Sequence, residues 1–227
     1  MRTLVAAHEV FGDSVPAGED RFDPRAGLAR AVAFADSLVR SQNSCGYWDL
    51  GYYEAWTADM AAALGIFPAL EPYVDEERRA RYQGTAERFL EGLKRDRFFL
   101  ASGAVSVGWR RAYKCDGTFV TSPSDSGHTD DPYLVSTALA GLEIQSWLYR
   151  RTRSEIYKQR ALAALEYTLS QIRPDGSLAG LAGKEGPFLT AAYVEEGWIA
   201  ADSLLGDPAE HASLQGTLPR HVAWLLR

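Results

Sequence analysis

Two adjacent carboxylates and a histidine stand directly before an apolar segment in HTDDPYLVSTALAGL, residues 128–142. A positioned carboxylic acid can donate a proton to a substrate, and a neighbouring imidazole can orient that acid and tune its pKa. We therefore predict that Asp130 or Asp131 is a proton donor, with His128 beside it. The structural alternative is that Asp131 before Pro132 is a helix N-cap, where the helix terminus favours the ionised carboxylate.

Two other apolar segments also carry acids. Asp59 interrupts AWTADMAAAL, and Glu195 and Glu196 interrupt TAAYVEEGWIAAD. Burying an unpaired carboxylate costs several kcal/mol, so we expect each acid to be paired, hydrated or directed into a polar cavity. Glu195 and Glu196 lie about 100° apart on a helix, so at least one of them faces solvent. The pattern predicts a pit whose wall includes Asp59, Asp130 and Glu195.

Aromatic residues are frequent around these acids. The face of an aromatic ring stabilises a nearby cation through its quadrupole. The predicted substrate contacts are Trp48, Tyr52, Tyr53, Trp56, Tyr133, Tyr193 and Trp198.

The elements that position these residues are mostly helices, because apolar residues recur at helical spacing from Asp23 onward. Residues 1–23 are expected to be an N-terminal arm with little structure, followed by a single domain over residues 24–227. The expected helices cover 24–42, 53–65, 75–93, 132–150, 155–172, 188–205 and 208–226. Pro219 is expected to interrupt the last one. Only RFFLASGAVSVGW, residues 97–109, is predicted to be extended.

Three segments share one order: a helix with a charged face, a glycine turn, and an alanine-rich helix. The turns are Cys45–Trp48, Cys115–Phe119 and Pro174–Leu178, each with a glycine where positive φ is expected. Helices with one polar face belong outside an assembly, and helices that are apolar all round belong inside it. The alternation predicts an all-α fold, an α/α toroid or partial α/α barrel of about seven helices in hairpins, with the turns at the mouth of a central cavity.

The segment AVAFADSLVRSQNSCGYWDLGYYEAWTADMAAALGI resembles a repeat of the prenyltransferase and squalene-cyclase type, in which a helix ends in Gln, a Gly-x-aromatic turn follows, and an inner helix carries Thr-Ala-x-x-x-Ala-Leu. YTLSQIRPDGSLAG is similar to the Gln-x-x-Asp-Gly-Ser turn of these repeats, with Leu178 where the family usually has tryptophan. The resemblance covers most of residues 27–206 and implies the toroid fold. In class II terpene cyclases an Asp-x-Asp-Asp motif protonates an alkene or epoxide, and HTDD is similar in position, with His128 replacing the first acid.

The residues and the resemblance together imply a cyclase or isomerase of a hydrophobic small molecule, isoprenoid or polyene-like, that works by acid-initiated chemistry in an aromatic-lined cavity. One alternative is a carbohydrate-active hydrolase, lyase or epimerase, using a carboxylate pair or His128 with a tyrosine. The other is a non-catalytic small-molecule binding domain, because folds of this type host unrelated functions. Acids at one end of an apolar pit favour the cyclase, whereas acids on opposite walls favour sugar chemistry. No phosphate loop or dinucleotide fingerprint is present, so no cofactor is expected.

A zinc site is a further alternative at the turns. Cys115, Asp116 and His128 lie in one loop, and Cys45 lies in the corresponding turn of the preceding hairpin. Thiolate, carboxylate and imidazole all bind zinc, but this spacing matches no zinc-finger pattern. We expect ordinary cysteines near turns and no metal.

Composition restricts partners and location. The 227 residues are enough for one core, and the net charge of -6 opposes attraction to nucleic acids and anionic membranes. No segment approaches the roughly 20 apolar residues of a membrane helix. Two cysteines make no disulfide framework, and the apolar stretch at residues 4–7 is too short for a signal peptide. We expect a cytoplasmic protein with free thiols and a small-molecule substrate, with homo-oligomerisation left open.

Overall fold

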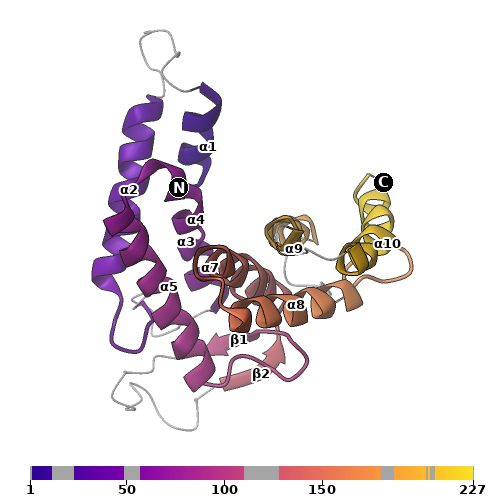
Figure 1. Ribbon diagram of the computed structural model, residues 1–227. Helices are drawn as coiled ribbons and strands as arrows, with labels where there is room; N and C mark the ends of the chain where they lie inside the picture. Colours follow the sequence, from indigo (N-terminus) through magenta and orange to yellow (C-terminus); the bar gives the residue numbers. More distant parts are fainter. Residues whose placement is uncertain are drawn as a thin grey trace.

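Helices dominate the computed structural model, which describes residues 2–11, 23–48, 57–109, 128–179, 187–202, 204 and 208–226 (Figure 1). The elements are α1 (Arg2–Phe11), α2 (Pro24–Ser41), α3 (Thr57–Leu64), α4 (Ile66–Leu70), the 3-10 helix η1 (Glu71–Tyr73), α5 (Glu76–Arg95), β1 (Ser106–Trp109), β2 (His128–Pro132), α6 (Leu134–Ser136), η3 (Thr137–Glu143), α7 (Ile144–Thr152), α8 (Glu155–Ser170), α9 (Pro187–Asp202) and α10 (Pro208–Leu225). The predicted all-α class is confirmed, with one small antiparallel sheet of β1 and β2 added. Within the described residues, none of the helices combines the length and the apolar character needed to span a bilayer.

The starts of two outer helices follow from local chemistry. Asp23 accepts a hydrogen bond from the amide of Arg25 at 2.9 Å, and Pro24 occupies the first helical position of α2. Asp75 accepts from the amide of Arg78 at 2.8 Å at the start of α5. Both carboxylates satisfy an amide that the helix itself leaves without a partner. The predicted start of α2 is therefore confirmed.

Asp75 predicts a specific acid sensitivity. The amide of Arg78 lowers the pKa of Asp75 below its usual 3.8, and the charges of Arg78 and Arg81 act in the same direction. A carboxyl with a lowered folded-state pKa stabilises the fold above its unfolded pKa, and that contribution is lost as the pH falls through the folded pKa. Because Asn caps a helix without titrating, Asp75→Asn should flatten the fall in unfolding free energy below about pH 4. Urea titrations across that range measure it, and curves parallel to wild type would contradict the assignment.

Three expectations about elements are wrong. The N-terminal arm contains α1, which packs on α2 and α4 with Val5 only 1% exposed. The last helix is not interrupted, because α10 runs through Pro219; losing one backbone hydrogen bond does not outweigh the packing of this helix. The helix expected from residue 132 begins at Leu134 and passes through the π-helical stretch η3. The extended segment is confirmed in part, as β1.

The most apolar helices lie inside. Every residue from Leu134 to Leu148 is buried, and η3 within this stretch packs against α3, α8 and α9. A helix that is apolar all round needs such neighbours on every side. α5 and α8, which have exposed charged residues, lie further out (Figure 1).

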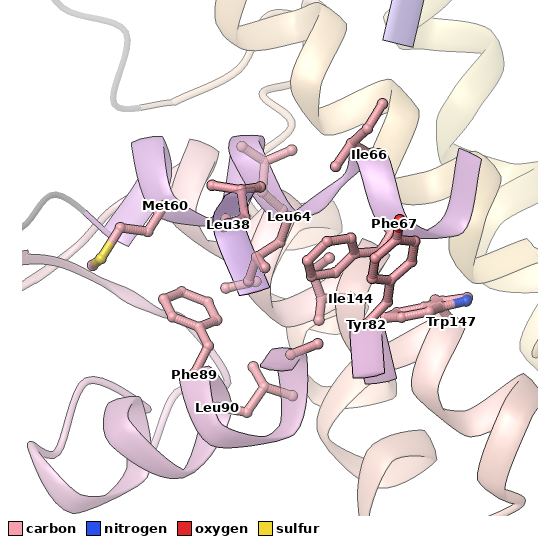
Figure 2. Close-up of a cluster of buried hydrophobic side chains, with 14 of the residues drawn as sticks. Leu38, Met60, Leu64, Ile66, Phe67, Tyr82, Phe89, Leu90, Ile144 and Trp147 are labelled. Carbon is pink, nitrogen blue, oxygen red and sulfur yellow. The ribbon is translucent and has the colours of Figure 1, made fainter. Parts of the chain in front are cut away.

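The larger core cluster fills the space between α3, α4, α5 and α7 (Figure 2). Phe67 stacks on Tyr82 with ring centroids 4.6 Å apart, and Trp147 lies 6.3 Å from Phe67. Tyr82 donates a hydrogen bond to Asp36 at 3.0 Å, so its polar end is satisfied although the residue is buried. The pKa of Tyr82 is raised by burial and by this carboxylate.

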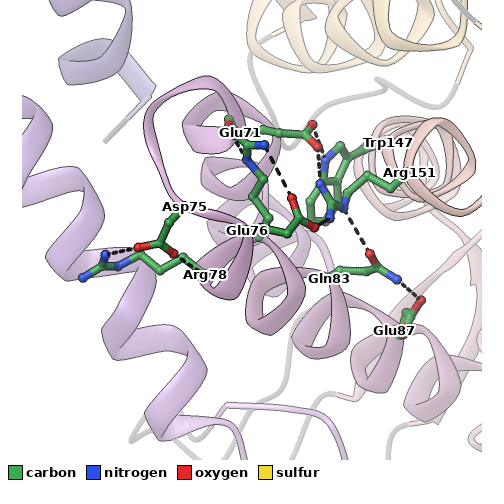
Figure 3. A network of polar contacts seen from close by, with 9 residues as sticks. Glu71, Asp75, Glu76, Arg78, Gln83, Glu87, Trp147 and Arg151 are labelled. Carbon is green, nitrogen blue, oxygen red and sulfur yellow. Dashed lines mark hydrogen bonds and ion pairs between the residues drawn. The ribbon is translucent and has the colours of Figure 1, made fainter.

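A polar network fixes α7 against η1 and α5 (Figure 3). Arg151 donates to Glu71 at 2.6 Å, to Glu76 at 2.8 Å and to Gln83 at 3.0 Å. The indole of Trp147 donates to the other oxygen of Glu71 at 2.9 Å. The planar guanidinium can hold three acceptors at once, which a lysine could not do with the same geometry.

Three glycine turns have one hydrogen-bond pattern. In each turn, the amide of the first residue donates to the carbonyl four residues later, and the glycine amide donates back to the carbonyl of the first residue. The pairs are Asn43–Tyr47 and Gly46–Asn43, Leu100–Ala104 and Gly103–Leu100, and Arg173–Ser177 and Gly176–Arg173. The glycines have φ of 88°, 86° and 91°. The predicted turns at Gly46 and Gly176 therefore share one geometry with a third turn at Gly103, which the sequence did not predict; the turn predicted at Cys115–Phe119 lies outside the described residues.

Each of these glycines also touches the next outer helix. A Cβ at Gly46, Gly103 or Gly176 would overlap a backbone carbonyl oxygen of α5, α8 or α10 respectively. Backbone cannot yield as a flexible side chain can, so glycine is required both by its positive φ and by this close approach. Each turn therefore packs closely against the backbone of the outer helix that follows it.

Candidate functional site

Asp131 and its neighbours lie in a strand, not at a helix start. β2 runs antiparallel to β1, with His128 opposite Trp109. The N-cap of α6 is Tyr133, whose side chain does not cap the helix, so the N-cap interpretation of Asp131 is wrong. Asp131 is exposed, while the side chains of His128 and Asp130 lie outside the described residues.

Replacing Asp131 should therefore leave stability almost unchanged. Asp131→Asn removes neither a cap nor a buried group, so we expect an unfolding free energy within about 0.5 kcal/mol of wild type. Thermal unfolding of both proteins measures it. A drop of about 1 kcal/mol or more would restore the capping role.

The other predicted site residues that the structure describes lie in different surroundings. Asp59 is exposed in the first turn of α3. Trp48 is buried, and its indole donates to the carbonyl of Leu38 at 2.8 Å, which makes it a core residue. Tyr133 and Tyr193 are half-buried against the larger core cluster. The remaining predicted contacts, Tyr52, Tyr53 and Trp56, lie outside the described residues.

Glu195 is the predicted acid that the structure places beside a second titratable group. Its Oε1 atom lies 3.2 Å from Nε2 of His221, whose side chain is 1% exposed. This approach is within ion-pair distance, yet neither atom has a hydrogen-bond partner of good geometry in the described structure. Two buried polar atoms of complementary chemistry thus face each other without a completed bond.

The protonation of His221 is constrained from its other side. Nδ1 lies 2.8 Å from the carbonyl oxygen of Gly176. A carbonyl only accepts, so Nδ1 carries the hydrogen and the lone pair of neutral His221 is on Nε2. The Gly176 turn follows α8 in the sequence and contacts α10. Its carbonyl therefore determines that neutral His221 carries its hydrogen on Nδ1.

Aromatic rings hold His221 in place. Trp198 meets it edge to face at 5.3 Å, and Trp224 stacks on it at 5.5 Å. The indole of Trp198 donates to the buried hydroxyl of Thr168 at 2.9 Å. An imidazole fixed on two faces and at one nitrogen keeps Nε2 directed at Glu195.

A pocket of about 320 Å³ opens beside this pair, between α9 and α10. Its wall on α9 includes Glu195, Trp198, Ile199 and Asp202, and Leu218 contributes from α10. Seven residues, or about two turns, separate Glu195 from Asp202, so both acids lie on the same face of α9. Among the described lining residues, the acids therefore lie on α9, next to the apolar side chains of Trp198, Ile199 and Leu218.

The arrangement can hold one movable proton. At 3.2 Å, Oε1 of Glu195 and Nε2 of His221 are close enough for one proton to be bound by either atom. With that proton, the pair is carboxylate with imidazolium or carboxylic acid with imidazole. Either form can donate a proton to a group in the pocket and take one back.

A second group of acids meets on the inner helices. Arg2 donates to Glu143 at 2.8 Å and to Glu196 at 2.9 Å. Burial raises the pKa of Glu143, while the charge of Arg2 opposes this shift. Glu196 is more than half exposed, as expected for one member of the Glu195–Glu196 pair.

Cys45 corrects the expectation of free thiols. It is disulfide-bonded, so its sulfur is not a thiolate ligand. Disulfides persist mainly in oxidising compartments, which does not fit the expected cytoplasmic location. Cys115 and Asp116 lie outside the described residues. Among the residues that are described, no group of three or more His, Cys, Asp or Glu side chains could hold a metal ion.

Comparison of the chain with known protein families, with curated proteins and with solved structures finds no match. Sequence reasoning had identified Glu195 and Trp198 but missed His221, Glu143 and Arg2. His221 stands in LPRHVAWLL, with an apolar residue three positions before it and another four positions after it. That spacing indicates a histidine on the buried face of a helix and was the available signal.

Proposed function

We propose that the protein is an isomerase or cyclase of a hydrophobic small molecule, isoprenoid or polyene-like, that uses the pocket between α9 and α10. The observation that carries this proposal is the contact of Glu195 with the buried His221, whose tautomer is set by the carbonyl of Gly176, at the edge of an apolar pocket. The proton donor is thus Glu195 with His221, in place of Asp130 or Asp131. Non-catalytic binding in the same pocket is the competing function.

The chemistry is a proton transfer at each end of the reaction. The pair gives a proton to one carbon of a double bond, whose π electrons form the new C–H bond and leave a carbocation. Trp198 lines the pocket, and its ring stabilises that positive charge. Loss of a proton from a neighbouring carbon to the pair restores the double bond and regenerates the acid, so no co-reactant is consumed.

The position of the acids favours this class over sugar chemistry. Glycosidases place two carboxylates on opposite sides of the scissile bond. Here the two carboxylates among the described lining residues, Glu195 and Asp202, belong to one helix, and Leu218 lies on the other wall. An apolar substrate is also favoured by Ile199, which is 75% exposed.

The proposal includes the α/α toroid arrangement, as a partial barrel. Two observations support this arrangement. Turns with the same hydrogen-bond pattern occur at Gly46, Gly103 and Gly176, and buried helices lie inside exposed ones. The resemblance of the turns to prenyltransferase and squalene-cyclase repeats points the same way.

The test is a search for proton transfer in D2O. The protein is incubated with a panel of isoprenoids, polyenes and oligosaccharides, and mass spectrometry follows deuterium uptake and rearrangement. We expect deuterium in an apolar alkene. Conversion of a sugar would favour the carbohydrate-active alternative, and saturable binding of an alkene without deuterium uptake would show a binding domain.

A further inference from the structure

α1 is tied to the inner helices by one side chain. Arg2 Nη2 donates to Glu143 Oε2 at 2.8 Å, and Nη1 donates to Glu196 Oε2 at 2.9 Å. Glu143 belongs to η3 and Glu196 to α9, 141 and 194 positions away from Arg2 along the chain. We call these three residues the Arg2 clasp. The clasp joins three helices that are far apart in the sequence.

A glycine provides the space for the guanidinium. Gly65 lies between α3 and α4, and a Cβ at this position would overlap the guanidinium of Arg2. The neighbouring atoms are those of a side chain, so the absence of a side chain at Gly65 is what admits Arg2 there. The site that holds the Arg2 guanidinium is therefore formed by three separate segments, which contribute Gly65, Glu143 and Glu196.

The clasp differs from an ordinary surface ion pair in its burial. The side chain of Glu143 is 11% exposed and that of Arg2 is 31% exposed, whereas Glu196 is 52% exposed. A buried carboxylate is costly without a cation, and Arg150 is the other positive charge that acts on Glu143. Arg150 donates to the carbonyl of Ala200 at 3.1 Å, and Arg2 is bonded directly to Glu143.

Apart from Arg2, α1 is held by its packing on α2 and α4. It is ten residues long, and an isolated helix of that length is marginal in water. Val5 is buried against the core, His8 meets Tyr73 edge to face at 5.3 Å, and Tyr73 donates a hydrogen bond to Glu9. With Arg2 released, α1 keeps these contacts but loses its bonds to η3 and α9.

We infer that α1 is a strap, closed by the Arg2 clasp across η3 and α9, and that its release uncovers the buried carboxylate of Glu143, beside the already exposed Glu196, while the core stays folded. This inference is independent of the proposed catalytic function, because it involves neither the Glu195–His221 pair nor the pocket beside it.

Hydrogen exchange of the full chain tests the strap. Arg2→Ala should raise amide exchange in α1 at least about tenfold, with exchange in α5 and α7 unchanged. Glu143→Gln should have the same effect to a smaller degree, because the amide oxygen still accepts one hydrogen bond from Arg2. The matched control is Arg30→Ala, which removes an exposed arginine from α2 and should change nothing.

Two outcomes would overturn the inference. If α1 stays as protected in Arg2→Ala as in wild type, Val5 and the neighbouring contacts hold the helix without the clasp. If α1, α5 and α7 all exchange faster by the same factor, the arginine supports global stability and no separate strap exists. Protection lost from α1 alone supports the strap, whatever the activity of the protein.

Discussion

Glu195→Gln is expected to lower turnover of the responsive alkene by about 10²–10⁴-fold, the usual contribution of a positioned acid or base. Glutamine has the shape of glutamate but carries no exchangeable acid proton, so the shared proton is lost while the packing remains. Deuterium uptake from D2O under single-turnover conditions measures the chemical step directly.

His221→Asn should lose activity to a similar degree. The asparagine amide can still donate to the carbonyl of Gly176, so the turn is retained while the nitrogen that faces Glu195 is removed. Glu166→Gln is the control, since Glu166 is exposed on α8. Full turnover in both site variants would refute the acid–base role of the pair.

Gly46→Ala should destabilise the fold by more than about 2 kcal/mol. An alanine at φ 88° pays about 1–2 kcal/mol for left-handed backbone, and its Cβ also overlaps the carbonyl oxygen of Arg88. Relief requires α2 and α5 to move apart, because the obstacle is backbone. Chemical unfolding followed by circular dichroism measures the loss.

Gly84→Ala is the matched control for that variant. Gly84 is inside α5, and its nearest neighbour is the end of the Arg88 side chain at an ordinary 3.7 Å. Alanine favours helix over glycine, so we expect a gain of up to about 1 kcal/mol. If both variants lose the same stability, close approach of the turn to α5 is not what requires glycine at position 46.

Local signals predicted the helices well. Asp23 followed by Pro24 marked the start of α2, because an N-cap and a proline at the first turn act through atoms only a few residues apart. The glycine turns at residues 46 and 176 were also found. The turn predicted at Cys115–Phe119 lies outside the described residues. The turn at Gly103 was not predicted, because its need for glycine comes from contact with a carbonyl of α8.

Roles in the site were harder to assign. Trp48 and Trp198 both stand near turns or on apolar helices, yet Trp48 bonds Leu38 in the core and Trp198 lines the pocket. An aromatic residue has the same local pattern in either case. Pro219 similarly indicated a break that the packing of α10 prevents.

The amino-acid sequence by itself determined that this protein is helical, which helices are apolar all round, and where glycine turns join two of the hairpins, because periodicity and capping act over a few residues. Only the tertiary structure decided which groups lie beside these acids: Glu195 meets His221, and Glu143 and Glu196 meet Arg2. It also placed Asp59 and Asp131 in exposed positions. The physical reason is that the charge and proton of a carboxylate depend on groups within a few ångströms, and here those groups come from distant parts of the chain.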